Sequence, residues 1–334
     1  MWQRPRSSAA WLPACAGAAL CVCALGAQQS PAQQGATFRS AQRTVAVYTT
    51  VTEAGGRLAI DLGKDDFEVY DDGKLQTLSL FANEVQPITI VSMLDVSGSM
   101  SGNISLLRRA GAQLAAHLSK ADKARFGEFG DHVNVITPAF TNDVNELIRS
   151  LWLELEPGGA TPLWNAVDVA MNALTDQSGR RVVLVFTDGY DTSSARTTLS
   201  SVVRRAQEED FMIYAVGLRS NGGMSIGGRP RGGFGASVSA DEPDPGLKTL
   251  AEESGGGYMA LQAATELDAA FTRVVEELRH QYILGFVPAS LDGRLHRLDV
   301  RVKQPGLTAR ARKSYLAAPE KSGSSDKHRE HDRR

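Results

Sequence analysis

Cysteine is almost absent from this chain. Its 334 residues include three cysteines, Cys15, Cys21 and Cys23, and all of them fall in one short apolar stretch near the N-terminus. The rest of the sequence contains no cysteine and therefore cannot form a disulfide. Its stability must come from core packing, and a hydrophobic content of 42% is ordinary for one large or two medium globular domains.

An excess of charge of one sign is missing as well. The 36 lysine and arginine residues nearly balance 38 aspartates and glutamates, which leaves a formal net charge of -2 and no electrostatic reason to expect nucleic acid as a partner. The sequence contains no P-loop and no G-x-G-x-x-G. The letters G-x-S-x-G occur at residues 223–227, but in a glycine-rich segment and not at the strand-to-helix turn of a nucleophile elbow.

Long hydrophobic runs are confined to the N-terminus. Arg4 and Arg6 precede an apolar stretch over residues 9–25, and small residues follow it. This order predicts a secretory signal peptide over residues 1–27. An uncleaved signal anchor is the alternative, although Pro13 interrupts a stretch that barely reaches spanning length. We therefore expect an exported protein, periplasmic, extracellular or at the cell surface, with no membrane span in the mature chain.

Composition and turn signals divide the remaining residues. Residues 28–40 are polar and aperiodic, as is typical of a linker. Residues 41–86 and 282–317 are β-rich, and in residues 87–281 strands alternate with helices. A glycine-rich insertion over residues 219–246 is expected to be flexible, or else a functional loop. The charge-rich residues 318–334 predict a disordered tail.

The two β-rich segments are each too small to fold alone. The first holds a hairpin signal, in which 66–70 and 75–81 flank a turn whose acidic pair, Asp71 and Asp72, is expected to be solvated. The second holds three candidate strands, 282–287, 297–302 and 308–315. About three strands on each side are too few for independent stability. We therefore predict that they pair with each other as one discontinuous β-sandwich, into which the central domain is inserted.

The central segment predicts a doubly wound α/β domain. Its first strand, Ile88–Leu94, is a continuous apolar run, typical of a strand buried on both faces of a parallel sheet. Later strands are expected over 181–186 and 211–218, with a strand-turn-strand over 124–135. Helices are expected over 104–118, 144–153, 163–174, 199–208, 247–254 and 266–280. Strands separated by helices pair in parallel, so the sheet should be mostly parallel with helices on both faces.

Polar side chains follow the first buried strand at alternate positions. Asp95, Ser97 and Ser99 stand where this strand ends, and alternate residues of an extended chain reach the same side. In open α/β sheets, ligands bind at the carboxyl ends of the strands. One carboxylate with two hydroxyls is an oxygen-only set, which suits a hard cation such as magnesium.

Two later stretches complete a motif. The turn-forming loop Gly158-Gly159-Ala160-Thr161 places a threonine just before a helix, and the strand over 181–186 leads into Thr187-Asp188-Gly189. D-x-S-x-S, a Gly-Gly-x-Thr loop and T-D-G after an apolar strand together resemble the metal-ion-dependent adhesion site of the von Willebrand factor type A family. The block over 65–81 adds a resemblance to secreted bacterial VWFA-related proteins.

The resemblance implies both a site and a function. Ser97, Ser99 and Thr161 would bind a divalent cation directly, and Asp95 and Asp188 directly or through water. Magnesium is the expected ion, with manganese or calcium as alternatives. One coordination position would stay open for an Asp or Glu of an unknown partner protein, so the chain would mediate metal-dependent protein–protein binding or adhesion. No catalytic residue is predicted.

Two other functions stay open. The protein could be a structural or assembly subunit whose metal only braces the loops, or a metal-dependent hydrolase. Against the hydrolase, no histidine adjoins the motif in sequence, so the general base would have to be a carboxylate that already holds metal. Asp191, three residues after Asp188, is expected to cap its turn or the next helix.

Overall fold

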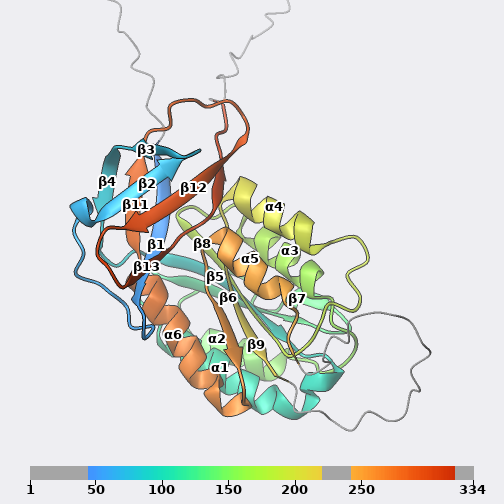
Figure 1. Cartoon of the computed structure of the whole chain (residues 1–334). Helices are drawn as coiled ribbons and strands as arrows, with labels where there is room; N and C mark the ends of the chain where they lie inside the picture. The colour runs from blue at the N-terminus through green and yellow to red at the C-terminus, as the bar shows by residue number, and fades with distance from the viewer. Residues whose placement is uncertain (1–43, 220–241, 320–334) are drawn as a thin grey trace, which may run out of the picture. The chain divides into compact units, whose positions relative to one another are not determined.

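The computed structural model describes residues 44–219 and 242–319, whose arrangement is shown in Figure 1. They form a six-stranded sheet with helices on both faces and two four-stranded sheets. The predicted signal peptide and linker, most of the glycine-rich insertion and nearly all of the tail lie outside the described residues. Among the helices of 44–219 and 242–319, none combines the length and apolar character needed to cross a membrane.

The six-stranded sheet is built from apolar strands paired in parallel. Its order is β10-β9-β8-β5-β6-β7, in which β7 alone runs antiparallel to its neighbour. All eight residues of β5 are buried, as the continuous apolar run predicts for a central strand. The strands are β5 (Ile88–Asp95), β6 (Lys123–Phe129), β7 (Val133–Val135), β8 (Arg180–Thr187), β9 (Met212–Leu218) and β10 (Tyr258–Leu261).

Two apolar cores cover the two faces of this sheet. One contains α1 (Ile104–Ala116), α2 (Val144–Leu153) and α6 (Leu267–Arg279), and the other α3 (Leu163–Leu174), α4 (Leu199–Glu209) and α5 (Gly246–Ser254). The predicted doubly wound α/β domain is thereby confirmed. Strand β10 is an addition to the predicted strands: it is four residues long, has no β-branched side chain and follows three glycines, which signal a turn.

The β-rich segments form two sheets around one core. The sheet orders are β13-β1-β11-β4 and β14-β12-β2-β3, and β1 pairs with β11 as β2 pairs with β12, both antiparallel. Each sheet thus combines strands from before and after the α/β domain, which confirms the predicted discontinuous β-sandwich. The strands are β1 (Val45–Glu53), β2 (Phe67–Asp71), β3 (Lys74–Gln76), β4 (Leu78–Ala82), β11 (Tyr282–Phe286), β12 (Leu295–Val302), β13 (Leu307–Arg310) and β14 (Ser314–Leu316).

Two stretches predicted as single strands are each divided between the sheets. Residues 75–81 break at Thr77, so that β3 pairs with β2 whereas β4 pairs with β11 in the other sheet. Residues 308–315 divide in the same way, because β13 pairs with β1 and β14 with β12. The alternation of side chains predicts an extended conformation for each stretch but does not show where the chain changes sheet at a corner of the sandwich.

One arginine ties the sandwich to the α/β domain at the start of β8. Arg180 is 4% exposed, and its guanidinium donates to the backbone oxygens of Gln86 (2.8 Å) and Leu278 (2.5 Å) and to Oε1 of Gln281 (2.9 Å). Gln86 lies where the chain enters the α/β domain, and Gln281 lies where it leaves. Both connections are therefore held at the same end of the sheet.

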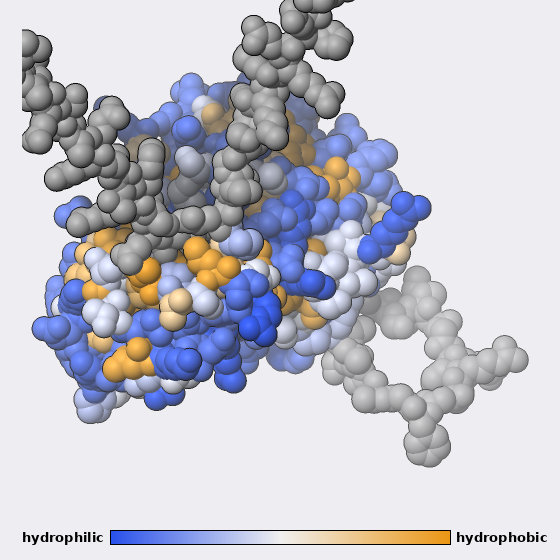
Figure 2. Space-filling view, turned by 90° about the horizontal axis from the view of Figure 1, so that it is seen from above, coloured by the Kyte–Doolittle hydropathy of each residue, from blue (hydrophilic) through white to orange (hydrophobic). Residues whose placement is uncertain are grey.

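The surface seen from above is largely hydrophilic, with separate hydrophobic areas (Figure 2). The exposed large apolar side chains of the described residues are spread over different elements, among them Leu75 on β3, Leu80 on β4, Leu295 on β12, and Trp152 and Leu153 at the end of α2. Scattered apolar residues of this kind are normal on a protein surface.

A polar cluster centred on His296 is buried in the sandwich, and the exposed Asp292 joins it from the surface. His296 of β12 is 8% exposed, and its ring nitrogens lie 3.0 Å from Oδ1 of Asp71 and 3.1 Å from Oδ1 of Asp292. The hydroxyl of Tyr315 donates to Oδ2 of Asp71 (3.1 Å). The expectation that Asp71 is solvated is therefore wrong: alternation along β2 turns it inward, and Asp72 is the exposed member of the pair.

These contacts predict a pH-dependent stability. Burial lowers the pKa of His296, but its hydrogen bonds to Asp71 and Asp292 outweigh burial and raise the pKa above the usual value. A histidine of this kind stabilises the fold fully below its unfolded pKa of about 6.5, and loses that contribution as pH rises through the folded pKa. We expect His296→Gln to flatten the decline in the free energy of unfolding above about pH 6.5. Denaturant titrations across this range measure it, and parallel pH profiles of the two proteins would contradict it.

Candidate metal centre

The candidate site lies where β5 and β8 end side by side. These strands pair in parallel, with Ile88 opposite Arg180 and Leu94 opposite Phe186, so that Asp95 and Thr187 come next on neighbouring strands. Asp95 is fully buried and Asp188 is 5% exposed, whereas Ser99 is exposed. The carboxylates therefore lie below a rim that is open to solvent at Ser99.

Direct hydrogen bonds connect four of the five predicted residues. The backbone N–H of Ser97 donates to Oδ1 of Asp95 (2.9 Å), and the Thr187 hydroxyl donates to Oδ2 of the same carboxylate (2.5 Å). The hydroxyl oxygens of Ser97 and Ser99 are 3.2 Å apart, and the Ser99 hydroxyl donates to Oδ1 of Asp188 (2.8 Å). Thr187 was not among the predicted site residues, although it is the first letter of T-D-G.

The loop that carries Thr161 packs on the same rim. Gly98 N–H donates to the oxygen of Gly159 (3.1 Å), and Gly158 N–H donates to the oxygen of Val96 (2.8 Å). A methyl group on the Cα of Gly189 would lie 3.6 Å from the hydroxyl oxygen of Thr161, which places that hydroxyl beside the T-D-G turn. The structure thus brings the five predicted residues to one rim. Their role as metal ligands stays a prediction.

Glycine is required in this loop for steric reasons. Gly159 has a φ of +84°, in the left-handed region, and a Cβ there would lie 2.2 Å from Oδ1 and 2.5 Å from the backbone nitrogen of Asp131. A larger residue would be strained and would also collide with the turn after β6. The Gly-Gly signal in the sequence therefore reflects a close approach of two loops that hold the site together.

The electrostatics of the site fit a cation. Burial raises the pKa of Asp95 to about 6, against hydrogen bonds from Ser97 and Thr187 that lower it, and burial also raises the pKa of Asp188. Neither carboxylate forms an ion pair with a basic side chain among the described residues. Two uncompensated buried carboxylates beside hydroxyl oxygens are a donor set suited to a hard divalent ion.

Asp191 has the capping role expected of it, but on an unexpected helix. Its Oδ1 accepts the backbone N–H of Trp164 (3.3 Å) at the start of α3, which precedes it in sequence. The next helix, α4, is capped instead by Thr198, whose hydroxyl accepts the N–H of Ser201 (3.2 Å). Spacing along the chain cannot distinguish these two helices, because the contact to α3 depends on the tertiary fold.

A second group of possible ligands lies in the sandwich. Asp71, Asp72 and His296 each offer one atom, all within 4.8 Å of one another. Both ring nitrogens of His296 already face carboxylate oxygens, so the histidine donates in both directions and offers no lone pair to a metal. The donor set at the carboxyl ends of β5 and β8 is the better candidate.

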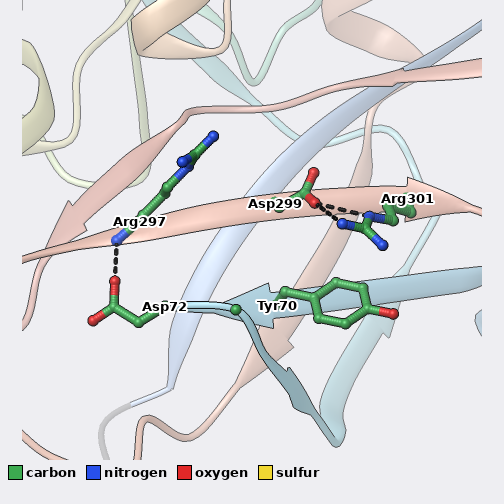
Figure 3. A pocket seen from close by; sticks show the side chains of 6 residues that line it. Tyr70, Asp72, Arg297, Asp299 and Arg301 are labelled. Carbon is green, nitrogen blue, oxygen red and sulfur yellow. Dashed lines mark hydrogen bonds and ion pairs between the residues drawn. The ribbon is translucent and has the colours of Figure 1, made fainter.

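Another hollow lies on the outer face of the sandwich, where β12 and β2 run side by side (Figure 3). There the guanidinium of Arg301 lies over the ring of Tyr70, 4.5 Å from its centroid, and pairs with Asp299 (2.7 Å). The backbone N–H of Arg297 donates to Oδ1 of Asp72 (2.9 Å). Acidic and basic side chains both line this hollow, in contrast to the carboxylates at the candidate site, which have no basic partner among the described residues.

The comparisons with known proteins point to one family. The family model of the von Willebrand factor type A domain matches residues 89–272, which spans β5, β8 and the loop of Thr161. No curated protein matches the chain.

Solved structures are similar at low identity. BatB, a conserved hypothetical protein from Bacteroides thetaiotaomicron, is 18% identical over 57% of this chain and 98% of its own, with a TM-score of 0.43. A von Willebrand factor type A protein from Catenulispora acidiphila is 12% identical over 84% and 75%, with a TM-score of 0.48. Proximal thread matrix protein 1 from the mussel byssus, with a zinc-occupied MIDAS motif, is 14% identical over 61% and 48%, with a TM-score of 0.46.

The buried charge of Asp95 predicts that its neutralisation will change the free energy of unfolding in opposite directions with and without metal. A carboxyl whose pKa is raised by folding costs stability above that pKa, so wild type in chelator should gain stability as pH falls from about 8 to 5. Asp95→Asn removes the charge at nearly constant volume. In chelator at about pH 8 we expect it to raise the free energy of unfolding by on the order of 1–3 kcal/mol.

Magnesium should reverse this order, because a ligand bound only by the folded state stabilises it. Denaturant unfolding of both proteins, with magnesium and with chelator, measures the effect. An Asp95→Asn variant less stable than wild type in chelator would show that the carboxylate is compensated within the fold.

Proposed function

This chain belongs to the von Willebrand factor type A domain family, and from that premise we propose that it is a metal-dependent protein-binding module. Asp95, Ser97, Ser99, Thr161 and Asp188 would hold a divalent cation at the rim of the α/β domain. The observation that supports this most strongly is the pair of buried carboxylates, Asp95 and Asp188, that have no basic partner among the described residues.

The charge balance of the site indicates what the bound ion would do. Two carboxylates at most balance a divalent cation, and the three other donors are neutral hydroxyls, so such a site binds its ion modestly and favours a further anionic oxygen. The rim is open at Ser99, where an outside group has access. When bound, the ion supplies a positive centre to which a carboxylate of a partner protein can bind. The partner is accordingly a protein that presents an Asp or Glu side chain.

Oxygen donors also indicate the kind of ion. Magnesium, manganese and calcium all prefer oxygen ligands, and the site has no sulfur or imidazole donor among its five residues. We propose magnesium as the resident ion.

The place of action is proposed from the N-terminus. Residues 1–27 have the basic start, apolar centre and small-residue exit of a secretory signal. A protein exported by such a signal would meet its partner in the periplasm, outside the cell or at the cell surface. Adhesion or assembly at the envelope is the role that fits.

The proposal is tested by partner capture. The full chain, immobilised, should retain proteins of the native envelope fraction in magnesium and release them on chelation. Asp95→Ala and Asp188→Ala should abolish that capture, because each removes a charged ligand while the strands that carry it stay packed. Asp143→Ala is the matched control: its carboxylate caps α2 in the same domain, away from the motif, and its capture should equal wild type.

Melting curves in parallel separate the remaining outcomes. Equal capture by wild type and both site variants, with and without chelator, would overturn the proposal. A magnesium-dependent melting temperature without magnesium-dependent capture would instead identify a structural subunit whose metal braces the loops.

A further inference from the structure

Helix α3, which begins directly after Thr161, has no cap of its own. The N-cap position is Pro162, which carries no side-chain acceptor, and the first intrahelical bond runs from Ala166 N–H to the Pro162 oxygen (2.9 Å). The N–H groups before Ala166 have no partner within the helix. A helix start without a local cap must find acceptors elsewhere in the fold or leave these donors to water.

The loop after β8 supplies those acceptors. Oδ1 of Asp191 accepts the N–H of Trp164 (3.3 Å), and Oγ of Ser194 accepts the N–H of Asn165 (3.0 Å). The carboxylate also lies at the positive end of the helix dipole, where negative charge is favoured. One loop thus caps a helix that precedes it by about 30 residues in sequence, and the same loop begins with Asp188 of the candidate site.

Between these two caps, Thr192 pairs reciprocally with Thr161. The hydroxyl of Thr192 accepts the backbone N–H of Thr161 (2.8 Å), and the N–H of Thr192 donates to the oxygen of Thr161 (2.9 Å). Both backbone groups of the predicted ligand residue are therefore held by one other residue. This link joins the Gly-Gly-x-Thr loop to the T-D-G loop.

Local structure alone restrains Thr161 weakly. Gly158 and Gly159 both have positive φ, and glycine is the residue with the most conformational freedom. On the other side, Pro162 cannot donate a hydrogen bond that would anchor the loop. Thr161 itself is 7% exposed, so its N–H would be largely shielded from water if the hydroxyl of Thr192 were removed.

We infer that Thr192 is a positioning residue of the metal site, whose hydroxyl fixes Thr161 in place to bind the cation. The inference rests on the proposed function, because it assigns Thr192 a role toward the same ion. Thr192 would not touch the metal. It would act by holding a ligand that belongs to another loop, so its removal should weaken metal binding while the other four ligands stay in place.

The test compares three variants of the full chain. Thr192→Val keeps the shape of the side chain and removes the hydroxyl, and Thr192→Ser restores it. Thr198→Val is the matched control, since the Thr198 hydroxyl likewise accepts one backbone N–H and Thr198 is also exposed, but its contact is with Ser201 of α4. Magnesium and manganese affinities are measured by titration calorimetry. Hydrogen–deuterium exchange over residues 158–165 is followed in chelator, independently of metal.

Thr192→Val should bind both ions about threefold to tenfold more weakly than wild type, the effect of one hydrogen bond. It should also exchange faster over 158–165 in chelator. Thr192→Ser should restore both properties, and Thr198→Val should lower the melting temperature while leaving metal affinity unchanged. If Thr192 only stabilised the fold, Thr192→Val would behave like Thr198→Val, with a lower melting temperature and an unchanged metal affinity.

The outcomes separate this inference from the proposed function. If wild type binds metal and Thr192→Val binds it equally well, or if Thr192→Ser is as weak as Thr192→Val, the positioning role is overturned and the metal site stands. If wild type binds neither ion, the proposed function fails and the role of Thr192 fails with it.

Discussion

The parallel register of β5 against β8 is the constraint on which the candidate site depends. Pairing from Ile88 opposite Arg180 to Leu94 opposite Phe186 brings the last residues of two distant segments together. A slip of one residue would turn Asp95 from one face of the sheet to the other and separate it from Thr187. The start of β8 is held at the opposite end as well, because Arg180 donates to the backbone oxygen of Gln86 at one connection between the α/β domain and the sandwich and to the side chain of Gln281 at the other. Strand β8 therefore contacts the junction of the sandwich and the α/β domain at its start and leads into the candidate site at its end.

The sequence predicts those parts of the structure that depend on local pattern. The apolar run into Asp95 and the T-D-G after a second apolar run each identify a strand and the residue at its end, and the rule that ligands bind at carboxyl ends then brings them together. The local pattern fails to predict the environment of a residue whose contacts are distant in sequence. Asp71 looks like a turn residue, yet it is buried against His296, which follows it by more than 200 residues. Thr192 has no signal in its surroundings that distinguishes it from the other hydroxyls of its loop.

The loops of the site have different roles: one packs closely against its neighbours, and another, distant in sequence, supplies the hydrogen bonds that hold it in place. The Gly-Gly-x-Thr-Pro segment is built for close approach: its glycines let Asp131 and Gly98 come near, and its proline starts a helix. The same residues leave that segment without a cap or a rigid support. Asp191, Thr192 and Ser194 in the loop after β8 compensate, because their side-chain oxygens accept backbone N–H groups of this segment and of the helix start that follows it. Such an arrangement makes the geometry of the site a property of the folded domain, absent from any of its segments alone.

The placement of buried charge also favours a cation at this rim. A fold selected for stability alone gains nothing from burying Asp95 and Asp188 without basic partners, since burial penalises their charged forms. Most other buried acids of the described residues have a basic partner: Asp71 pairs with His296, Asp122 with Arg279, and Glu277 with Arg273 and Arg310. Glu128 is the exception, and it is a single carboxylate that accepts the backbone N–H of Glu156. The uncompensated pair stands at the one rim where three hydroxyl-bearing residues of the motif also meet. Because most other buried acids of the described residues have a basic partner, two adjacent buried carboxylates without one favour a positive charge that comes from outside the chain. Hydroxyl and carboxylate oxygens are the donors that a hard cation requires.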